Sequence, residues 1–247
     1  MRTIFVLVVL CCSALLGTPA DPPPQDYAFT DVSVIDVANG ITVPHQTVTV
    51  HKNRITEVGN SGKVDIPPGA IKIDGRGLYL MPGIVDMHVH AQSPQDLALF
   101  VANGVTTVRN MRGSPIHLAL RKFISEGRLL GPTFYTCGPI LDGLPPTGES
   151  VTVVETELEA REIVQAQKDA GYDCIKVYTR LSKPVYKEIL KTAKEVGLPV
   201  AGHVPTDVGL DLALVLGQNS IEHLTGYLGA IEDADIGKNS AGAKIIK

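Results

Sequence analysis

One arrangement of residues recurs five times between residues 93 and 223 of this sequence. A segment with the apolar spacing of a helix ends in a glycine, and a short apolar segment, often rich in β-branched residues, comes soon after it. Thr156 with Glu159 three residues later is one of several signals of a helix N-terminus. This alternation predicts parallel βαβ units. The predicted helices are 93–104, 114–127, 155–171, 184–197 and 208–217.

The strand order indicates the class of α/β fold. With LYLMPGIVDMHVH, which ends at His90, counted as the first strand, six predicted strands follow one another along the chain. No Gly-x-Gly-x-x-Gly pattern follows any of them, which disfavours an open sheet that binds a dinucleotide. We therefore expect residues 80–247 to form an incomplete TIM-type (β/α)8 barrel, with about six βα units and truncated before strands 7 and 8.

Residues 21–79 have the pattern of a small β domain. FTDVSVIDV and QTVTVHKNRITEV alternate apolar and polar residues, as half-buried strands do. Residues 51–54 read as a hairpin turn, and AIKID as a further short strand. We expect the N-terminal part of a mostly antiparallel β-sandwich, with His45 and His51 on its surface.

The first 20 residues have the three regions of a secretory signal peptide. Arg2 precedes an apolar run, and small residues lead to Ala20 before a proline-rich segment. We predict cleavage near Ala20 and a secreted or periplasmic protein. A lipoprotein is a disfavoured alternative, because the residues before Cys11 and Cys12 are bulky.

Removal of that peptide leaves two cysteines, Cys137 and Cys174. In an exported chain such a pair permits a disulfide. Both cysteines fall in predicted core strands, where cysteine behaves as a small buried apolar residue, so we expect two free thiols.

The overall charge narrows the class of partner. The sequence has 22 basic and 26 acidic residues, a net charge of -4 and no long basic run. This pattern gives no electrostatic footprint for nucleic acid and favours a small-molecule or dipeptide substrate. The apolar run near the N-terminus is too short for a comfortable membrane span, so none is expected, and homo-oligomerisation stays open.

Histidines recur at the predicted strand ends. Alternate residues of a strand share a face, so His88, His90 and Asp86 would point to the same side. A solvated loop histidine beside a packed one would explain an isolated pair. However, His203 and His223 each lie six residues after the glycine that ends the preceding helix. Four of the seven histidines thus fall at the C-terminal rim of one barrel, which predicts a metal site.

Lys176 ends the fourth predicted strand at the same rim. Alone, it would be explained as a lysine whose stem lies along apolar surface while its ammonium reaches water. Beside four imidazoles, desolvation would favour loss of its proton. The free amine could then react with carbon dioxide, and carbamylated Lys176 would be an anionic ligand able to bridge two cations.

Together these segments resemble the amidohydrolase superfamily, in particular its secreted imidazolonepropionase-like and Xaa-Pro dipeptidase-like branch. The resemblance extends over residues 27–231 and rests on GLYLMPGIVDMHVH, NGVTTVRNM, GYDCIKVYTR, GLPVAGHV and NSIEHLTGY.

The resemblance implies a site with two divalent metal ions. His88 and His90 would bind one ion. His203 and His223 would bind the second, and carbamylated Lys176 would bridge the two. Zinc is the usual occupant, and it suits imidazole and oxygen ligands.

The superfamily also places an aspartate at the end of strand 8, where it ligates a metal ion and accepts a proton from the attacking water. The sequence stops at Lys247, and Asp233 and Asp235 come too early to replace that aspartate. The resemblance therefore implies a C-terminally truncated fragment, inactive by itself and without its catalytic residue.

The resulting hypothesis is a secreted metal-dependent amidohydrolase that cleaves C–N bonds of small substrates, such as Xaa-Pro dipeptides, with a metal-activated water. Tyr178 would share a face with Lys176, and Arg180 follows in the loop. Either could hold a substrate carboxylate, although a packed tyrosine and a surface arginine explain them equally well.

Two alternatives stay open. The first is a hydrolase of cyclic amides or an aminohydrolase acting on a heterocycle, as in imidazolonepropionases; a one-metal deaminase is disfavoured by the ligating lysine. The second is a non-catalytic barrel, against which the retention of all five ligand positions argues.

Overall fold

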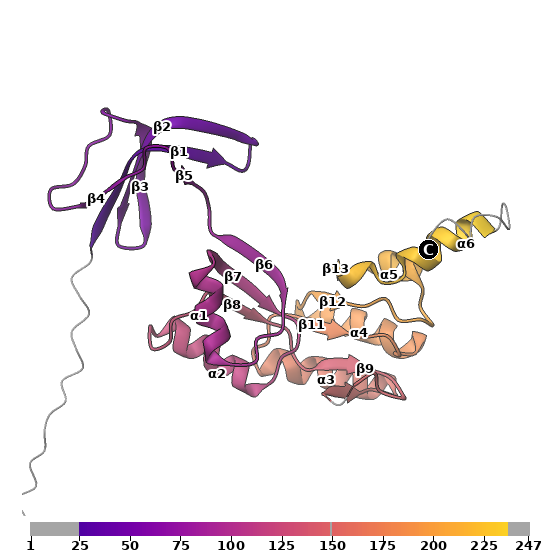
Figure 1. The fold of residues 1–247 in the computed structure, drawn as a ribbon. Coiled ribbons are helices and arrows are strands. Elements are labelled where there is room, and N and C mark those ends of the chain that lie inside the picture. Colours follow the sequence, from indigo (N-terminus) through magenta and orange to yellow (C-terminus); the bar gives the residue numbers. More distant parts are fainter. Residues whose placement is uncertain (1–24, 149, 237–247) are drawn as a thin grey trace, which may run out of the picture. The chain divides into compact units, whose positions relative to one another are not determined.

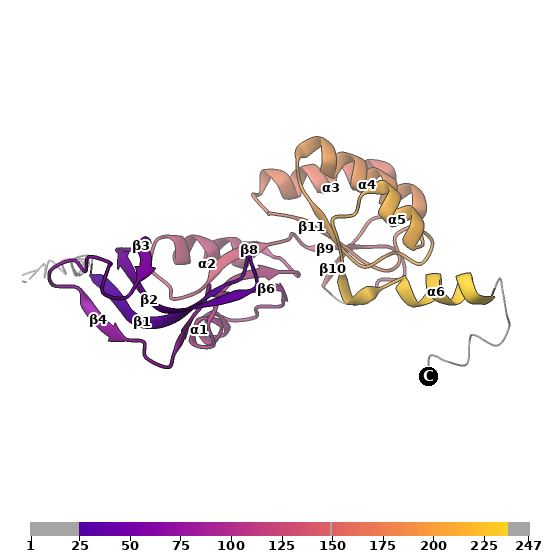
Figure 2. The ribbon, with the colours of Figure 1, turned by 90° about the horizontal axis from the view of Figure 1, so that it is seen from above.

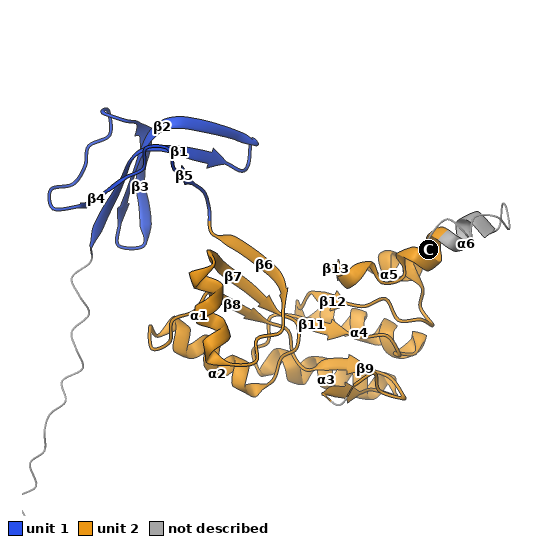
Figure 3. Cartoon of the chain, viewed as in Figure 1, with its two compact units in different colours: residues 1–82 blue, residues 83–247 orange. Residues whose placement is uncertain are grey.

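The computed structural model describes residues 25–148 and 150–236. The chain divides into two compact units, Met1–Pro82 and Gly83–Lys247, which we describe separately (Figure 3). The predicted signal peptide, including Cys11 and Cys12, lies outside the described residues.

One mixed β-sheet forms the described part of the first unit (Figure 1). Its strands are β1 (Asp26–Asp36), β2 (Ile41–His51), β3 (Arg54–Asn60), β4 (Ile71–Asp74) and β5 (Tyr79–Leu80). The predicted hairpin between β2 and β3 is present, with Lys52 in its turn at a φ of 55°. β4 and β5 pair in parallel with β1. The second layer of the predicted sandwich stays a prediction, whereas His45 and His51 are exposed as expected.

Parallel strands alternate with helices in the second unit. Its strands are β6 (Ile84–Val89), β7 (Val105–Asn110), β8 (Thr133–Thr136), β9 (Ile140–Asp142), β10 (Val151–Val153), β11 (Ile175–Val177), β12 (Val200–Gly202) and β13 (Ser220–Ile221). Its helices are α1 (Pro94–Ala102), α2 (Pro115–Ser125), α3 (Glu157–Asp169), α4 (Lys183–Val196), α5 (Leu210–Leu216) and α6 (Tyr227–Ile236), with a 3₁₀ turn at Glu222–Leu224. Within the described ranges, no helix is long and apolar enough to cross a membrane.

The prediction of an α/β fold with parallel strands is confirmed. α1 to α5 occupy the five predicted helical segments, and every strand pair described in this unit is parallel. The strands lie in the orders β6-β7-β8 and β10-β9-β11-β12-β13, so most neighbours follow chain order. Sequential parallel neighbours are the arrangement of a (β/α) barrel wall. The count of six units and closure into an eight-stranded barrel stay predictions.

The third predicted strand is shorter than expected, and an unpredicted strand follows it. The segment PTFYTCG (residues 132–138) is predicted to form one strand, whereas β8 covers only Thr133–Thr136 and β9 (Ile140–Asp142) begins after that segment. Pro139 between them has no N–H to donate to a strand ladder. β8 consequently pairs with β7, whereas β9 pairs with β11.

The prediction of two free thiols is wrong, because Cys137 and Cys174 form a disulfide. The two residues are direct partners in a parallel bridge, and their Cα atoms are 4.2 Å apart. Both are buried beside Met111 and Ala201. Each cysteine does lie in the core, as expected, but their register against each other was not visible in the sequence.

The largest apolar core lies between the helices α3 and α4 and the strands β9, β11 and β12 (Figure 2). Ile175 and Val177 of β11 are fully buried in this core. Successive side chains of a strand point to opposite faces, so Lys176 points away from these helices. In a barrel that direction is the interior.

Candidate metal centre

Four histidines gather at the C-terminal ends of the strands of the second unit. His88 belongs to β6 and His90 follows it, His203 follows β12, and His223 lies in the 3₁₀ turn after β13. The ring centroid of His88 is 5.2 Å from that of His90 and 4.5 Å from that of His223. His203 continues the row, with its centroid 5.3 Å from that of His223. We call these four residues the histidine cluster.

The backbone of His223 adopts an unusual conformation, with φ at 57° and ψ at 22°. Such left-handed conformations cost a non-glycine residue free energy and occur preferentially at functional sites. The turn after β13 thus holds His223 in the histidine cluster rather than continuing the strand.

The Nδ1 atoms of two members of the histidine cluster, His88 and His203, have hydrogen-bond partners. Nδ1 of His88 lies 2.5 Å from Oε2 of Glu222, and Nδ1 of His203 lies 3.0 Å from Oγ1 of Thr179. An ionised carboxylate can only accept, so Nδ1 of His88 carries the proton and its Nε2 carries a lone pair.

The distance between the Nε2 atoms of His88 and His90 fits a divalent cation bound to both. Nε2 of His88 and Nε2 of His90 are 3.3 Å apart. Two nitrogen ligands of a tetrahedral zinc ion, with bonds of about 2.0–2.1 Å, are separated by roughly 3.3 Å. Within residues 25–148 and 150–236, however, no three His, Cys, Asp or Glu side chains converge as one ligand group. The imidazole nitrogens are donors of the type that zinc binds, and the distance between Nε2 of His88 and Nε2 of His90 fits such an ion.

Lys176 is the most deeply buried charged residue of the site, with 1% of its surface exposed. Burial lowers the pKa of Lys176 to about 8; the charge of Glu222 opposes this shift and that of Arg109 adds to it. A neutral amine is the nucleophilic form of lysine. The neutral form of Lys176 is therefore more accessible near neutral pH than that of an exposed lysine.

Burial also favours the neutral imidazole ring in three members of the histidine cluster, His88, His90 and His203. Burial lowers the pKa of His203 to about 4, and the charges of Lys176 and His223 contribute further. Burial likewise lowers the pKa values of His88 and His90, although Glu222 opposes the shift of His88. Neutral imidazole is the form that binds metal ions.

Two charged residues of the site were missed by sequence reasoning. Glu222 is 8% exposed, and its Oε1 accepts a hydrogen bond from Nη2 of Arg109 at 2.8 Å. Burial raises the pKa of Glu222, but hydrogen bonds from Ser220 and His88 and the charge of Arg109 outweigh it, so the net pKa is lowered. The available signal was a charged residue inside each of two apolar strand motifs, NGVTTVRNM and NSIEHLTGY.

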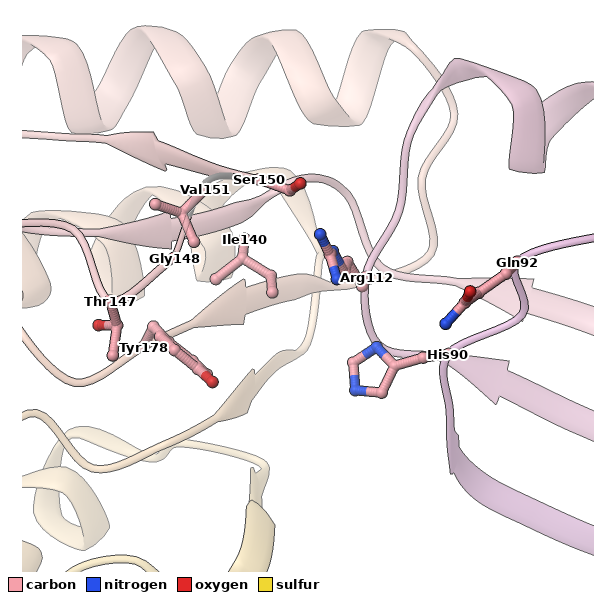
Figure 4. A pocket seen from close by; sticks show the side chains of 9 residues that line it. All are labelled: His90, Gln92, Arg112, Ile140, Thr147, Gly148, Ser150, Val151 and Tyr178. Atoms are coloured by element: carbon pink, nitrogen blue, oxygen red, sulfur yellow. The ribbon is translucent and has the colours of Figure 1, made fainter.

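A cavity of about 510 Å³ opens beside His90. Tyr178 lines it and stacks on His203, with ring centroids 4.0 Å apart. Arg112, which sequence reasoning did not select, lines it as well, and Figure 4 shows Arg112 and His90 pointing into the same space with Tyr178 opposite them. Arg180 lines a separate cavity of about 390 Å³, so a substrate-binding role for Arg180 stays a prediction.

Known proteins share both the sequence pattern and the fold. The profile of the amidohydrolase family matches residues 79–238. An adenine deaminase of Clostridium perfringens is 24% identical over 207 residues, which are 75% of this chain and 35% of the deaminase. The chain spans only 17% to 35% of the length of the curated relatives that it matches.

Solved structures of two known proteins also superpose on this chain. A bottromycin amidohydrolase superposes with a TM-score of 0.72 and 30% identity, covering 86% of this chain and 47% of that one. A Xaa-Pro dipeptidase with bound methionine superposes with a TM-score of 0.64 and 22% identity, covering 81% of this chain and 61% of the dipeptidase. Since the family profile matches more than half of the chain, and the parallel strands end in the histidine cluster, this chain belongs to the amidohydrolase family.

Proposed function

We propose that this protein is a metal-dependent hydrolase of C–N bonds in small amides. One observation carries the proposal: Lys176 is buried at the strand ends, where its charge acts on His88, His90 and His203, and burial lowers its pKa to about 8. Burying a cationic group is costly, and an apolar residue would stabilise a barrel that served only as a scaffold. The match to a bottromycin amidohydrolase at 30% identity supports amide hydrolysis.

The ligands divide into two groups and a shared residue. His88 and His90 would hold one divalent cation, and His203 and His223 a second. Lys176, carbamylated, would supply an anionic oxygen to both, which offsets the charge that two cations bring. When bound, such cations lower the pKa of water towards neutrality and polarise the scissile carbonyl. Zinc suits this combination of imidazole and oxygen donors.

The cavity beside His90 is the proposed substrate site. Its volume of about 510 Å³ lies within the range of pockets that bind small ligands. The side chain of Arg112 is exposed there, and it makes no ion pair with another residue of the described chain. A guanidinium recognises a carboxylate through two parallel hydrogen bonds, and the hydroxyl of Tyr178 can add a third. A free α-carboxylate, as in an Xaa-Pro dipeptide, therefore suits the cavity.

An aminohydrolase of a heterocycle is the second candidate. The alignment with an adenine deaminase over 207 residues favours it. Adenine distinguishes the two candidates at Arg112, because a purine has no carboxylate for the guanidinium to bind. A non-catalytic barrel is a third and weaker alternative.

The test uses the purified full-length gene product. Metal content is measured, and the protein is incubated with a panel of Xaa-Pro and other dipeptides, adenine and cyclic amides. We expect at least one dipeptide to be hydrolysed, the activity to disappear with a chelator, and zinc to restore it. Deamination of adenine without dipeptide hydrolysis would support the second candidate. No bound metal and no turnover of any compound would support the third.

Arg112→Met provides a prediction for substrate recognition. Loss of charge-assisted hydrogen bonds is worth roughly 1.5–3 kcal/mol, so kcat/KM for a dipeptide should fall by about 10- to 100-fold, mainly through KM. The corresponding dipeptide amide, which lacks the carboxylate, should be hydrolysed equally by both proteins. Arg180→Met is the comparison variant, which retains the wild-type KM if Arg112 alone holds the carboxylate. A reversed result, with the loss in Arg180→Met alone, would assign the carboxylate to Arg180.

We also propose that the protein is exported. The disulfide between Cys137 and Cys174 supports this, because disulfides persist in oxidising compartments. Mass spectrometry of the exported fraction should give an N-terminus near Asp21 and, without reductant, a pair of peptides joined through the two cysteines. Reduction should separate that pair. An intact Met1 in soluble cytosolic protein, with both thiols free, would contradict the proposal.

A further inference from the structure

Glu222 connects three strands of the second unit around one ring of the histidine cluster. It follows β13, its Oε2 lies 2.5 Å from Nδ1 of His88 on β6, and its Oε1 lies 2.8 Å from Nη2 of Arg109 on β7. The hydroxyl of Ser220 donates to the same oxygen as Arg109. Both oxygens of the buried carboxylate therefore have partners.

Arg109 contacts both Glu222 and the backbone next to His88. Its Nε donates to the backbone oxygen of Met87 at 2.8 Å, directly before His88. Its Nη2 also lies 3.1 Å from Oγ of Ser220. One guanidinium thus fixes both the backbone that carries His88 and the carboxylate that contacts the ring of His88. The side chains of Arg109 and Glu222 are 16% and 9% exposed, so solvent screens their pairing little.

We propose that Glu222 is a positioning residue for the metal ligand His88, with Arg109 as its anchor. The carboxylate accepts the Nδ1 proton of His88, which leaves the lone pair on Nε2, the nitrogen that faces His90. A carboxylate behind a ligating imidazole fixes its tautomer and ring orientation and raises its basicity. This inference rests on the proposed metal-dependent function.

His203, in the other half of the histidine cluster, has a neutral partner in place of a carboxylate. Nδ1 of His203 lies 3.0 Å from the hydroxyl of Thr179, which is neutral and can donate or accept. A neutral hydroxyl orients a ring less strictly than a carboxylate and adds less electron density to it. A cation held by His88 and His90 would consequently be bound more tightly than one held by His203 and His223.

The first experiment measures metal affinity. The full-length protein is stripped of metal and titrated with zinc in competition with a chromogenic chelator, and cobalt(II) spectra are recorded in parallel. Glu222→Gln should weaken zinc binding by roughly 10- to 100-fold and alter the cobalt spectrum, as expected for loss of an outer partner of a ligand. Ser220→Ala, a milder change, should act in the same direction, and Thr179→Val should affect the weaker zinc equivalent.

Glu188→Gln is the matched control, because Glu188 also pairs with an arginine, Arg161, at 2.6 Å, but on the helices α3 and α4. This variant should bind zinc like the wild type. Wild-type zinc affinity and an unchanged cobalt spectrum in Glu222→Gln, even with a lower melting temperature, would overturn the proposal and leave Glu222 a structural role only.

The second experiment separates this proposal from the proposed function. Nitrogen-15 NMR of the metal-free protein reports the tautomer of His88 directly. We expect the Nδ1–H tautomer in the wild type and a mixture in Glu222→Gln. The Nε2–H tautomer in the wild type would overturn the positioning role. A wild-type protein that shows the Nδ1–H tautomer but binds no zinc would overturn the metal-dependent function and leave the role of Glu222 towards His88 intact.

Discussion

Lys176→Ala in the full-length protein should lose bound metal and nearly all hydrolytic activity. The substitution removes the amine that would become the carbamate, and with it the anionic ligand shared by two cations. Metal ions contribute several kcal/mol to the stabilisation of a hydrolytic transition state, so kcat should fall by about 10³-fold or more. Short carboxylic acids that fill the space left by the side chain should restore part of the metal content and part of kcat.

Two further substitutions separate chemistry from folding. Lys176→Arg should not restore activity, because a guanidinium stays protonated and cannot be carboxylated. Lys176→Met keeps the volume of the buried side chain without its charge, so it should fold at least as stably as the wild type while remaining inactive. Lys191→Ala, at a surface lysine paired with Glu188, should keep full activity. Wild-type activity in Lys176→Ala would rule out the mechanism with two cations.

Gly202→Ala should strongly destabilise the second unit. Gly202 has a φ of +139°, and a Cβ at this position would lie 2.0 Å from the backbone oxygen of Val177. That oxygen already accepts the N–H of His203 at 3.0 Å, so β11 and β12 cannot separate without breaking their pairing. Strain and overpacking together should cost about 4 kcal/mol or more. Urea unfolding should show a lower midpoint with an unchanged slope.

Gly229→Ala is the control for this substitution. Gly229 lies in α6, and a Cβ there would meet no atom within 4 Å. Replacing an exposed helical glycine by alanine should stabilise the protein by roughly 0.5–1 kcal/mol. Similar midpoints for the two variants would show that β11 and β12 can separate at Gly202 without cost. Reduced zinc binding in Gly202→Ala is also expected, since β11 carries Lys176 and β12 leads to His203.

Local patterns in the sequence determined the secondary structure and much of the site. The Thr156 side chain accepts a hydrogen bond from the N–H of Glu159, whose side chain accepts one from Thr156 in return, which is the predicted start of α3. Gly197 and Gly217 end α4 and α5 with φ values of 71° and 81°. These signals involve few consecutive residues, so periodicity and capping suffice to read them. The order of the parallel units then assigned the histidines to one rim.

Contacts between distant segments were decided by the tertiary structure alone. The contact between His88 and Glu222 joins residues 134 positions apart, and the disulfide joins Cys137 and Cys174 across 37 positions. Both depend on which strands are neighbours and on their register, and hydrophobic periodicity constrains register only to the correct face. Pro139 lies between β8 and β9, which pair with different strands, β7 and β11. The sequence therefore determined which side chains reach the rim, and the register of paired strands decided which of them touch.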